Sequence, residues 1–402
     1  MSLGDILREN QIGTHATAKP ASPSFRLNLE KGELEFDSEV QIAPEDEHLA
    51  VELTKDIGVP IPRGHRLVLV EATLNQNAWT RDNEMQELAV TKPNWRYRFK
   101  VVKDDRVLSA EAIEEIKDYI LAVKPYAESN RPDTAGNDST FVVPLADFQI
   151  GKGSQGEGGT EALVERFQEQ LTQIVIDYTR SGARKILIAD VGDNSCEGEQ
   201  NVASQIGTND LQFTDQLVVW FRMFTKIVTE LASICPEVLV VGIPSNHSQH
   251  RKDGMPIGDP GNDYGLMTLK MLETTLALNP EAFSHVSFAR PERHKETLSV
   301  EVSGTVLGFA HGHQSNQPDR VPDFLKNQIA GRQPLEAADI IVTGHFHHLR
   351  VQNIVGNRWW FQCPANDAGS AWFTNRSGEF SSPGILTFTV KDGNWGNLRV
   401  IN

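Results

Sequence analysis

The feature that most limits how this chain can fold is a series of apolar runs, each ending in side chains able to bind a metal. Five such runs lie between residues 141 and 347, and segments with helical spacing of apolar residues separate several of them. This alternation of strands and helices indicates an α/β domain. Since ligand sites lie beyond the carboxyl ends of parallel strands, we expect the polar ends of the five runs to meet. The residues at these ends are Asp147, Gln149, Asp193, Asn246, His311, His345 and His347.

Each of these residues also has an ordinary structural explanation when it is taken alone. Asp147 and Asp193 can cap the turns that follow strands, and His311 can be a buried core histidine. Histidine, however, is the most common metal ligand, and three histidines follow one apolar run at 345–348. Five strand ends of the same chemical type favour a metal site over five separate coincidences.

The two ends of the chain differ in pattern. Residues 1–110 begin with an acidic, Pro-interrupted segment and continue with runs rich in β-branched and aromatic residues, which predicts a small accessory α+β domain. Helical spacing followed by a polar Gly/Pro stretch predicts a helix and a linker at 111–140. Residues 141–402 form the predicted main domain, and a length of 402 residues fits more than one domain.

Composition narrows the classes of function and location. A net charge of −16 argues against general nucleic-acid coating, which depends on Lys and Arg neutralising phosphates. The aromatic and basic run at 94–106 can still contact nucleic acid, although an outward sheet face is the preferred explanation. The apolar runs are far shorter than the ~20 residues of a membrane span. With no secretory signal pattern and three widely spaced cysteines, we expect a cytoplasmic protein with no membrane partner.

The order of the motifs resembles that of the calcineurin-like metallophosphoesterase superfamily over about residues 141–370. The matching stretches are "DFQ" at 147–149, "GDN" at 192–194, "SNH" at 245–247, "HGH" at 311–313 and "GHFH" at 344–347. The run "CPANDAGS" at 363–370 loosely resembles the loop that follows the last motif. The resemblance implies a four-layer α-β-β-α sandwich, in which two packed mixed sheets are flanked by helices. The accessory domain and the D-x-Q motif look similar to phage-encoded and bacterial members.

The resemblance also implies a centre with two divalent metal ions. Mn²⁺ is the preferred metal, and Fe, Zn, Co, Ni and Mg are the alternatives. By this resemblance Asp193 bridges the two ions. The first site is completed by Asp147, Gln149 and His347. The second site is completed by Asn246, His311 and His345. Two such ions can clamp a phosphoryl group and activate a water molecule.

Other residues near the motifs are candidates for contact with substrate. The resemblance makes His247 the catalytic residue, because a histidine can donate a proton or hydrogen bond near neutral pH. Arg251, His250 and Lys152 are candidates for binding the substrate phosphate, and Arg251 is the best of them because guanidinium forks onto phosphate. The second histidine of "HGH", His313, is expected beside the ligands and not among them.

The motifs depart from the family pattern at several positions. Gln149 stands where most members have a metal-binding histidine, so the first site is expected to bind metal more weakly. Cys196 stands where many members have an aspartate that orients the catalytic histidine. Glu197 and Asp210 are possible replacements for that aspartate.

The predicted function is metal-dependent hydrolysis of a phosphate ester. A phosphodiesterase or nuclease-like activity is preferred, with a nucleic acid or nucleotide as substrate. A phosphomonoesterase of the same fold is the first alternative. A scaffold of this fold with weakened catalysis, binding protein or nucleic acid, is the second. The sequence predicts no oligomeric state.

Overall fold

The computed structural model describes residues 25–28, 31, 33–38, 49–50, 53–54, 59, 65–75, 94–103, 110–127, 137–153, 159–195, 209–367 and 382–402. The chain divides into two compact units, residues 1–106 and 107–402. Within these described residues, no helix is both long and apolar enough to cross a membrane.

The smaller unit contains an antiparallel sheet with the strand order β1-β2-β4-β3. Its strands are β1 (Phe25–Asn28), β2 (Glu33–Ser38), β3 (His65–Asn75) and β4 (Asn94–Lys103). Alternate residues of β4, Tyr97 and Phe99, are buried, as expected for a sheet with one covered face. Ala50 and Leu53, from short helical segments, belong to the same apolar cluster, so the unit has both α and β parts.

The larger unit contains two mixed sheets. The first has the order β10-β7-β6-β5-β16-β17, in which β10, β7, β6 and β5 are parallel and the last two strands antiparallel. Its strands are β5 (Asn137–Ala146), β6 (Ala183–Gly192), β7 (Glu237–Gly242), β10 (Val286–Ala289), β16 (Ile385–Lys391) and β17 (Asn394–Ile401). The last eight residues of β5 are all buried, because both faces of this strand are covered.

The second sheet has the order β11-β12-β13-β15-β14, with β12, β13 and β15 parallel. Its strands are β11 (Leu298–Val302), β12 (Thr305–Phe309), β13 (Ile340–Thr343), β14 (Arg350–Val355) and β15 (Arg358–Gln362). A separate two-stranded hairpin joins β8 (Arg251–Lys252) to β9 (Met255–Pro256).

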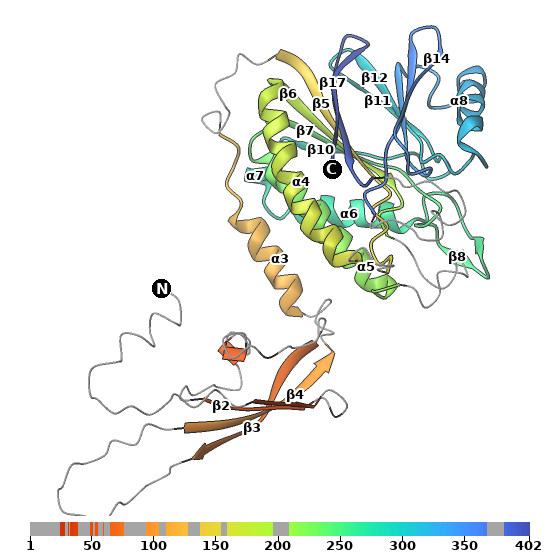
Figure 1. Ribbon diagram of the computed structural model, residues 1–402. Helices are drawn as coiled ribbons and strands as arrows, with labels where there is room; N and C mark the ends of the chain where they lie inside the picture. Colours follow the sequence, from red (N-terminus) through yellow and green to blue (C-terminus); the bar gives the residue numbers. More distant parts are fainter. Residues whose placement is uncertain are drawn as a thin grey trace, which may run out of the picture. The chain divides into compact units, whose positions relative to one another are not determined.

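Helices cover the outer faces of both sheets (Figure 1). On the first sheet these are α4 (Gly159–Ser181), α5 (Phe213–Ala232), α6 (Tyr264–Leu276) and the short α7 (Pro280–Phe283). The outer face of the second sheet packs against α8 (Val321–Ala330), which follows the 3-10 turn at Pro318–Arg320. The two inner faces share one apolar cluster, in which Phe361 and Phe388 meet edge to face at 5.0 Å. The predicted four-layer α-β-β-α sandwich is confirmed.

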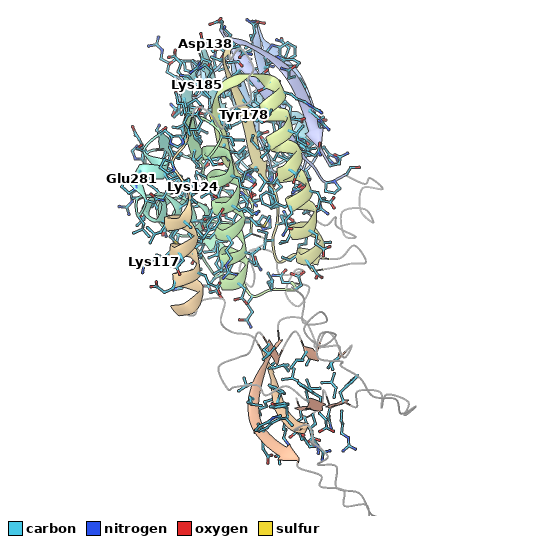
Figure 2. All side chains as sticks on the ribbon, turned by 90° about the vertical axis from the view of Figure 1, so that its left-hand side faces the viewer. Lys117, Lys124, Asp138, Tyr178, Lys185 and Glu281 are labelled. Atoms are coloured by element: carbon cyan, nitrogen blue, oxygen red, sulfur yellow. The ribbon has the colours of Figure 1, made fainter. Side chains whose placement is uncertain are left out.

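The segment expected as helix and linker joins the larger unit. Helix α3 (Ala110–Ala122) contacts α6, and Figure 2 shows it beside α5. The Tyr119 hydroxyl lies 2.8 Å from Thr229 Oγ1 on α5, and Asn279 Nδ2 donates to the carbonyls of Ile120 and Val123. Residues 137–140, included in the expected linker, are instead the first residues of β5. Residues 128–136 lie outside the described part of the chain.

Candidate metal centre

The seven candidate ligands lie directly after five strands, at facing edges of the two sheets. Hydrogen bonds between the sheets fix this convergence. His311 Nδ1, after β12, donates to the carbonyl oxygen of Val191 in β6 at 2.9 Å. The backbone N–H of His345, after β13, donates to Asp147 Oδ2 at 2.9 Å. Residues that are far apart in the sequence therefore share one site, as the strand-end pattern predicted.

The backbone at the site has a shared and unusual conformation. A positive φ angle is uncommon outside glycine and marks strain that the surrounding structure must compensate. Five of the seven candidate ligands have one, with φ between 45° and 72°: Asp147, Gln149, Asp193, His345 and His347. These left-handed residues turn the chain sharply at the strand ends, which keeps each side chain at the edge of its sheet.

The closest group of potential ligands is Asp193, His311 and His345. One ligand atom from each lies within 4.8 Å of the others. His311 Nε2 is 2.9 Å from Asp193 Oδ2, and the hydrogen bond of its Nδ1–H leaves Nε2 as the atom facing the carboxylate. The ring of His313 lies 5.6 Å from that of His311 and is outside this closest group.

The loop that follows β7 contains Asn246 and His247 and contacts Asp193. The backbone N–H of His247 donates to Asp193 Oδ1 at 2.9 Å, and its Nε2 lies 3.9 Å from Asp193 Oδ2. Asn246 Oδ1 is buried in the same loop. The carboxylate thus uses one oxygen for the loop backbone and presents the other to two imidazoles.

The residues proposed for the first site also meet. Asp147 Oδ1 lies 3.5 Å from His347 Nε2, and Gln149 Nε2 lies 3.2 Å from the same nitrogen. Asp147 Oδ1 is buried and accepts no hydrogen bond from any described residue. Such an orphaned oxygen is costly in a folded protein unless a cation or water satisfies it. Rotation of the Gln149 amide exchanges its nitrogen for a ligand oxygen.

The pKa values of several side chains at the centre are strongly shifted. Burial opposes ionisation of Asp193, but the positive charges of His311 and His247 outweigh it and hold its pKa well below the usual value. Burial likewise opposes charge on His311, but the Asp193 and Asp147 carboxylates raise its pKa to about 9. Burial and the charge on His311 lower the pKa of His345 to about 3. A bound metal takes the place of such protons, since it requires deprotonated ligands.

Two acidic residues that the sequence did not single out support the centre. Asp367 forms an ion pair with Lys152 and lies 3.6 Å from His347 Nδ1. It belongs to the "CPANDAGS" run, whose loose resemblance to the loop after the last family motif could have indicated it. Asp190 is buried, and it accepts hydrogen bonds from Gly192 N–H, Asn194 Nδ2 and Trp220 Nε1. It therefore fixes the turn that presents Asp193.

The candidate substrate contacts have different positions. Lys152 is neutralised by Asp367. Arg251 donates to the carbonyl oxygens of Gly254 and Asn246 and to Gln249 Oε1. The ring of His250 stacks on Tyr264, and its Nδ1 lies 3.2 Å from the Tyr264 hydroxyl.

Of the two possible replacements for the orienting aspartate, Glu197 and Asp210, the structure describes Asp210. Cys196 and Glu197 lie outside the described residues. Asp210 accepts hydrogen bonds from the backbone N–H and the hydroxyl of Thr160, both at 2.7 Å, at the start of α4. Its carboxylate thus stabilises the first turn of that helix.

Comparison with known proteins gives distant structural likenesses. No family model matches the chain, and no curated protein matches its sequence. Vps29 from Entamoeba histolytica, as a single mutant, has 14% identity and a TM-score of 0.27 over 65% of this chain and 99% of its own. An uncharacterised Streptococcus pneumoniae protein described as a predicted phosphoesterase has 9% identity and a TM-score of 0.23, over 51% and 83%. A purple acid phosphatase from yellow lupin seeds has 12% identity and a TM-score of 0.30, over 93% and 70%. At these scores the function has to be derived from the site itself.

Proposed function

We propose that this protein is a calcineurin-like metallophosphoesterase that hydrolyses a phosphate ester at a centre for two divalent metal ions. The observation that carries the proposal is the convergence of Asp193, His311 and His345, whose ligand atoms lie within 4.8 Å of one another. The buried, orphaned Asp147 Oδ1 supports a second cation position beside Asp193.

The donor set fits two metal sites that share Asp193. Asp147, Gln149 and His347 would hold the first ion. Asn246, His311 and His345 would hold the second. Mixed oxygen and imidazole ligands suit Mn²⁺, Fe, Co or Zn, and the neutral Gln149 amide favours a harder ion, for which we propose Mn²⁺. Two bound ions supply Lewis acidity to the phosphoryl oxygens and lower the pKa of a bound water.

His247 is the proposed catalytic residue. Its backbone N–H is tied to Asp193 Oδ1, so the imidazole is held at the edge of the centre. From there it can donate a hydrogen bond or a proton to the leaving oxygen of the ester. The side chain is only 10% exposed, so few water molecules compete for that contact.

We further propose a phosphodiester substrate, from a nucleotide or nucleic acid. A diester carries one negative charge and a monoester carries up to two. Lys152, next to His347, is already neutralised by Asp367, so its charge is not free to balance a second ionised oxygen of a monoester. A phosphomonoesterase is the alternative, and the cytoplasmic location stays a prediction.

The test compares hydrolysis of bis-p-nitrophenyl phosphate and p-nitrophenyl phosphate with added Mn²⁺. Asp193→Asn should lower hydrolysis at least about a hundredfold, because the shared ligand loses its charge. Asp323→Asn on α8, whose side chain is 63% exposed, is the matched control and should retain activity. Equal activity of the two variants would refute the role of Asp193, and preference for the monoester would refute the diester proposal. If the wild type neither binds metal nor cleaves either ester, the scaffold alternative replaces the enzyme.

A further inference from the structure

Two adjoining cavities open beside the Asn246–His247 loop. One, of about 230 Å³, is lined by His250, Tyr264 and Lys270, among others. The other, of about 650 Å³, is lined by Lys270, Arg290 and Arg293, among others. They share Gly261, Asn262 and Lys270, so they lie next to each other, and we call the two together the basic trough.

Backbone hydrogen bonds connect the trough to the segment that follows the Asn246–His247 loop. Tyr264 N–H donates to the Ser248 carbonyl at 2.8 Å, and His250 N–H donates to the Asn262 carbonyl at 3.3 Å. His250 is three residues from His247, so their Cα atoms are at most about 11 Å apart. A strand held at His247 therefore reaches the trough with its neighbouring nucleotides.

The wider part of the trough is rich in cationic side chains, in a chain whose net charge is −16. Its lining has three cations and a single acid, Asp259, which pairs with the exposed Arg293. Arg290 donates Nη2 to Glu273 at 2.6 Å, while its buried Nη1 has no hydrogen-bond partner among the described residues. Lys270 is exposed, and its ammonium group forms no ion pair with any residue that the structure describes.

The narrower part of the trough adds an aromatic wall. The rings of His250 and Tyr264 stack at 5.8 Å, and Phe213 meets the Tyr264 ring edge to face at 4.9 Å. Phosphate-binding cations next to aromatic rings are the combination by which proteins hold single-stranded nucleic acid.

We infer that the basic trough binds the sugar-phosphate backbone of a single-stranded nucleic acid that continues from the metal centre. Lys270, Arg290 and Arg293 contact phosphates, and the wall of His250 and Tyr264 packs against a base. Binding by the trough is independent of catalysis, but naming this strand as the substrate rests on the proposed function.

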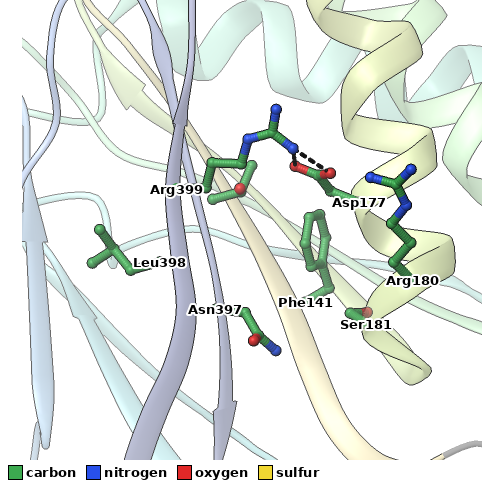
Figure 3. Close-up of a pocket in the computed structure, with 8 residues that line it drawn as sticks. Phe141, Asp177, Arg180, Ser181, Asn397, Leu398 and Arg399 are labelled. Carbon is green, nitrogen blue, oxygen red and sulfur yellow. Dashed lines mark hydrogen bonds and ion pairs between the residues drawn. The ribbon is translucent and has the colours of Figure 1, made fainter.

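A matched control for nonspecific charge effects lies elsewhere on the same unit. Arg180, in the last turn of α4, lines a separate cavity of about 340 Å³ (Figure 3). In that cavity Arg399 Nη1 is paired with Asp177 at 2.7 Å, and Arg180 forms no ion pair with a described residue. Reversing the charge of Arg180 thus changes net charge as much as reversing that of Lys270.

The experiment measures fluorescence anisotropy of a labelled oligothymidylate of about twelve nucleotides, with the full chain and a chelator to prevent cleavage. The wild type should bind with a Kd below about 100 µM at about 50 mM salt. Lys270→Glu, which changes the net charge as much as Arg180→Glu, should weaken binding at least about tenfold. The double variant Lys270→Gln with Arg293→Gln should lower the salt slope by about 1.4, for two lost phosphate contacts. Arg180→Glu should change the Kd less than about twofold.

Three results would overturn the inference. They are no binding by the wild type, equal weakening by Arg180→Glu and the trough variants, and an unchanged salt slope in the Gln variant. Hydrolysis of bis-p-nitrophenyl phosphate, measured separately with Mn²⁺, reports on the proposed function. If the wild type binds the oligonucleotide but cleaves no ester, the inference about the trough stands and the proposed enzymatic function is refuted.

Discussion

Gly192→Ala is the perturbation that most directly tests how closely the proposed metal centre is packed. Gly192 has φ +99°, and an added Cβ would lie 2.4 Å from Ser245 Cβ and 2.9 Å from His311 Nδ1. The left-handed backbone costs an alanine roughly 1–2 kcal/mol. Displacing Ser245 and His311 costs roughly a further 1–3 kcal/mol. We therefore expect the free energy of unfolding to fall by about 2–5 kcal/mol.

The matched control is Gly356→Ala. Gly356 also has a positive φ, +58°, but no heavy atom lies within 4 Å of an added Cβ, so only the backbone cost applies. Urea unfolding followed by circular dichroism measures both variants, and calorimetry measures their Mn²⁺ affinity. Gly192→Ala should bind Mn²⁺ at least about tenfold more weakly, because His311 is displaced, while Gly356→Ala retains wild-type affinity. Equal stability and equal Mn²⁺ affinity of the two variants would refute the close packing of Gly192 against the proposed metal ligand His311.

Three further predictions concern residues around the centre. Burial raises the pKa of Asp190 to about 6 despite its hydrogen bonds, so its folded pKa lies above the unfolded value. The wild type then loses up to about 3 kcal/mol of stability from this group as the pH rises from about 4 to 6. Its advantage over Asp190→Asn in urea unfolding should shrink by that amount between these pH values, and a constant difference would contradict the assignment. Gln149→His should tighten Mn²⁺ binding about tenfold in calorimetry, because imidazole is a stronger ligand than an amide, and an unchanged affinity would remove Gln149 from the ligand set. Asp210→Ala removes both acceptors used by Thr160 and should cost about 1–2 kcal/mol, seen as a melting temperature lower by about 3–6 °C. An unchanged melting temperature would show that this cap contributes nothing.

The sequence predicted the parts of the fold that depend on local pattern. The apolar runs became β5, β6, β7, β12 and β13. In each case the signal lies within a few neighbouring residues.

The features that the sequence did not reveal depend on contacts between distant segments. The role of Asp190 requires Trp220, thirty residues away, to donate its indole N–H. Asp367 meets His347 and Lys152 only after the two sheets have packed. The packing of α3 on α5 through Tyr119 was likewise hidden, because nothing near the helix indicates which unit it joins.

Backbone strain favours a metal centre over ordinary strand caps for the aspartates at the strand ends. Each left-handed non-glycine residue costs of order 1–3 kcal/mol, and five candidate ligands carry this cost. The turns give each carboxylate one backbone donor: His345 N–H binds Asp147 Oδ2, and His247 N–H binds Asp193 Oδ1. A cap needs nothing more, yet the second oxygen of each aspartate is buried and directed at histidine nitrogens, 3.5 Å away for Asp147 and 2.9 Å for Asp193. A fold that needed only caps would not bury these oxygens among imidazoles, whereas metal ions bound there would satisfy both kinds of ligand at once.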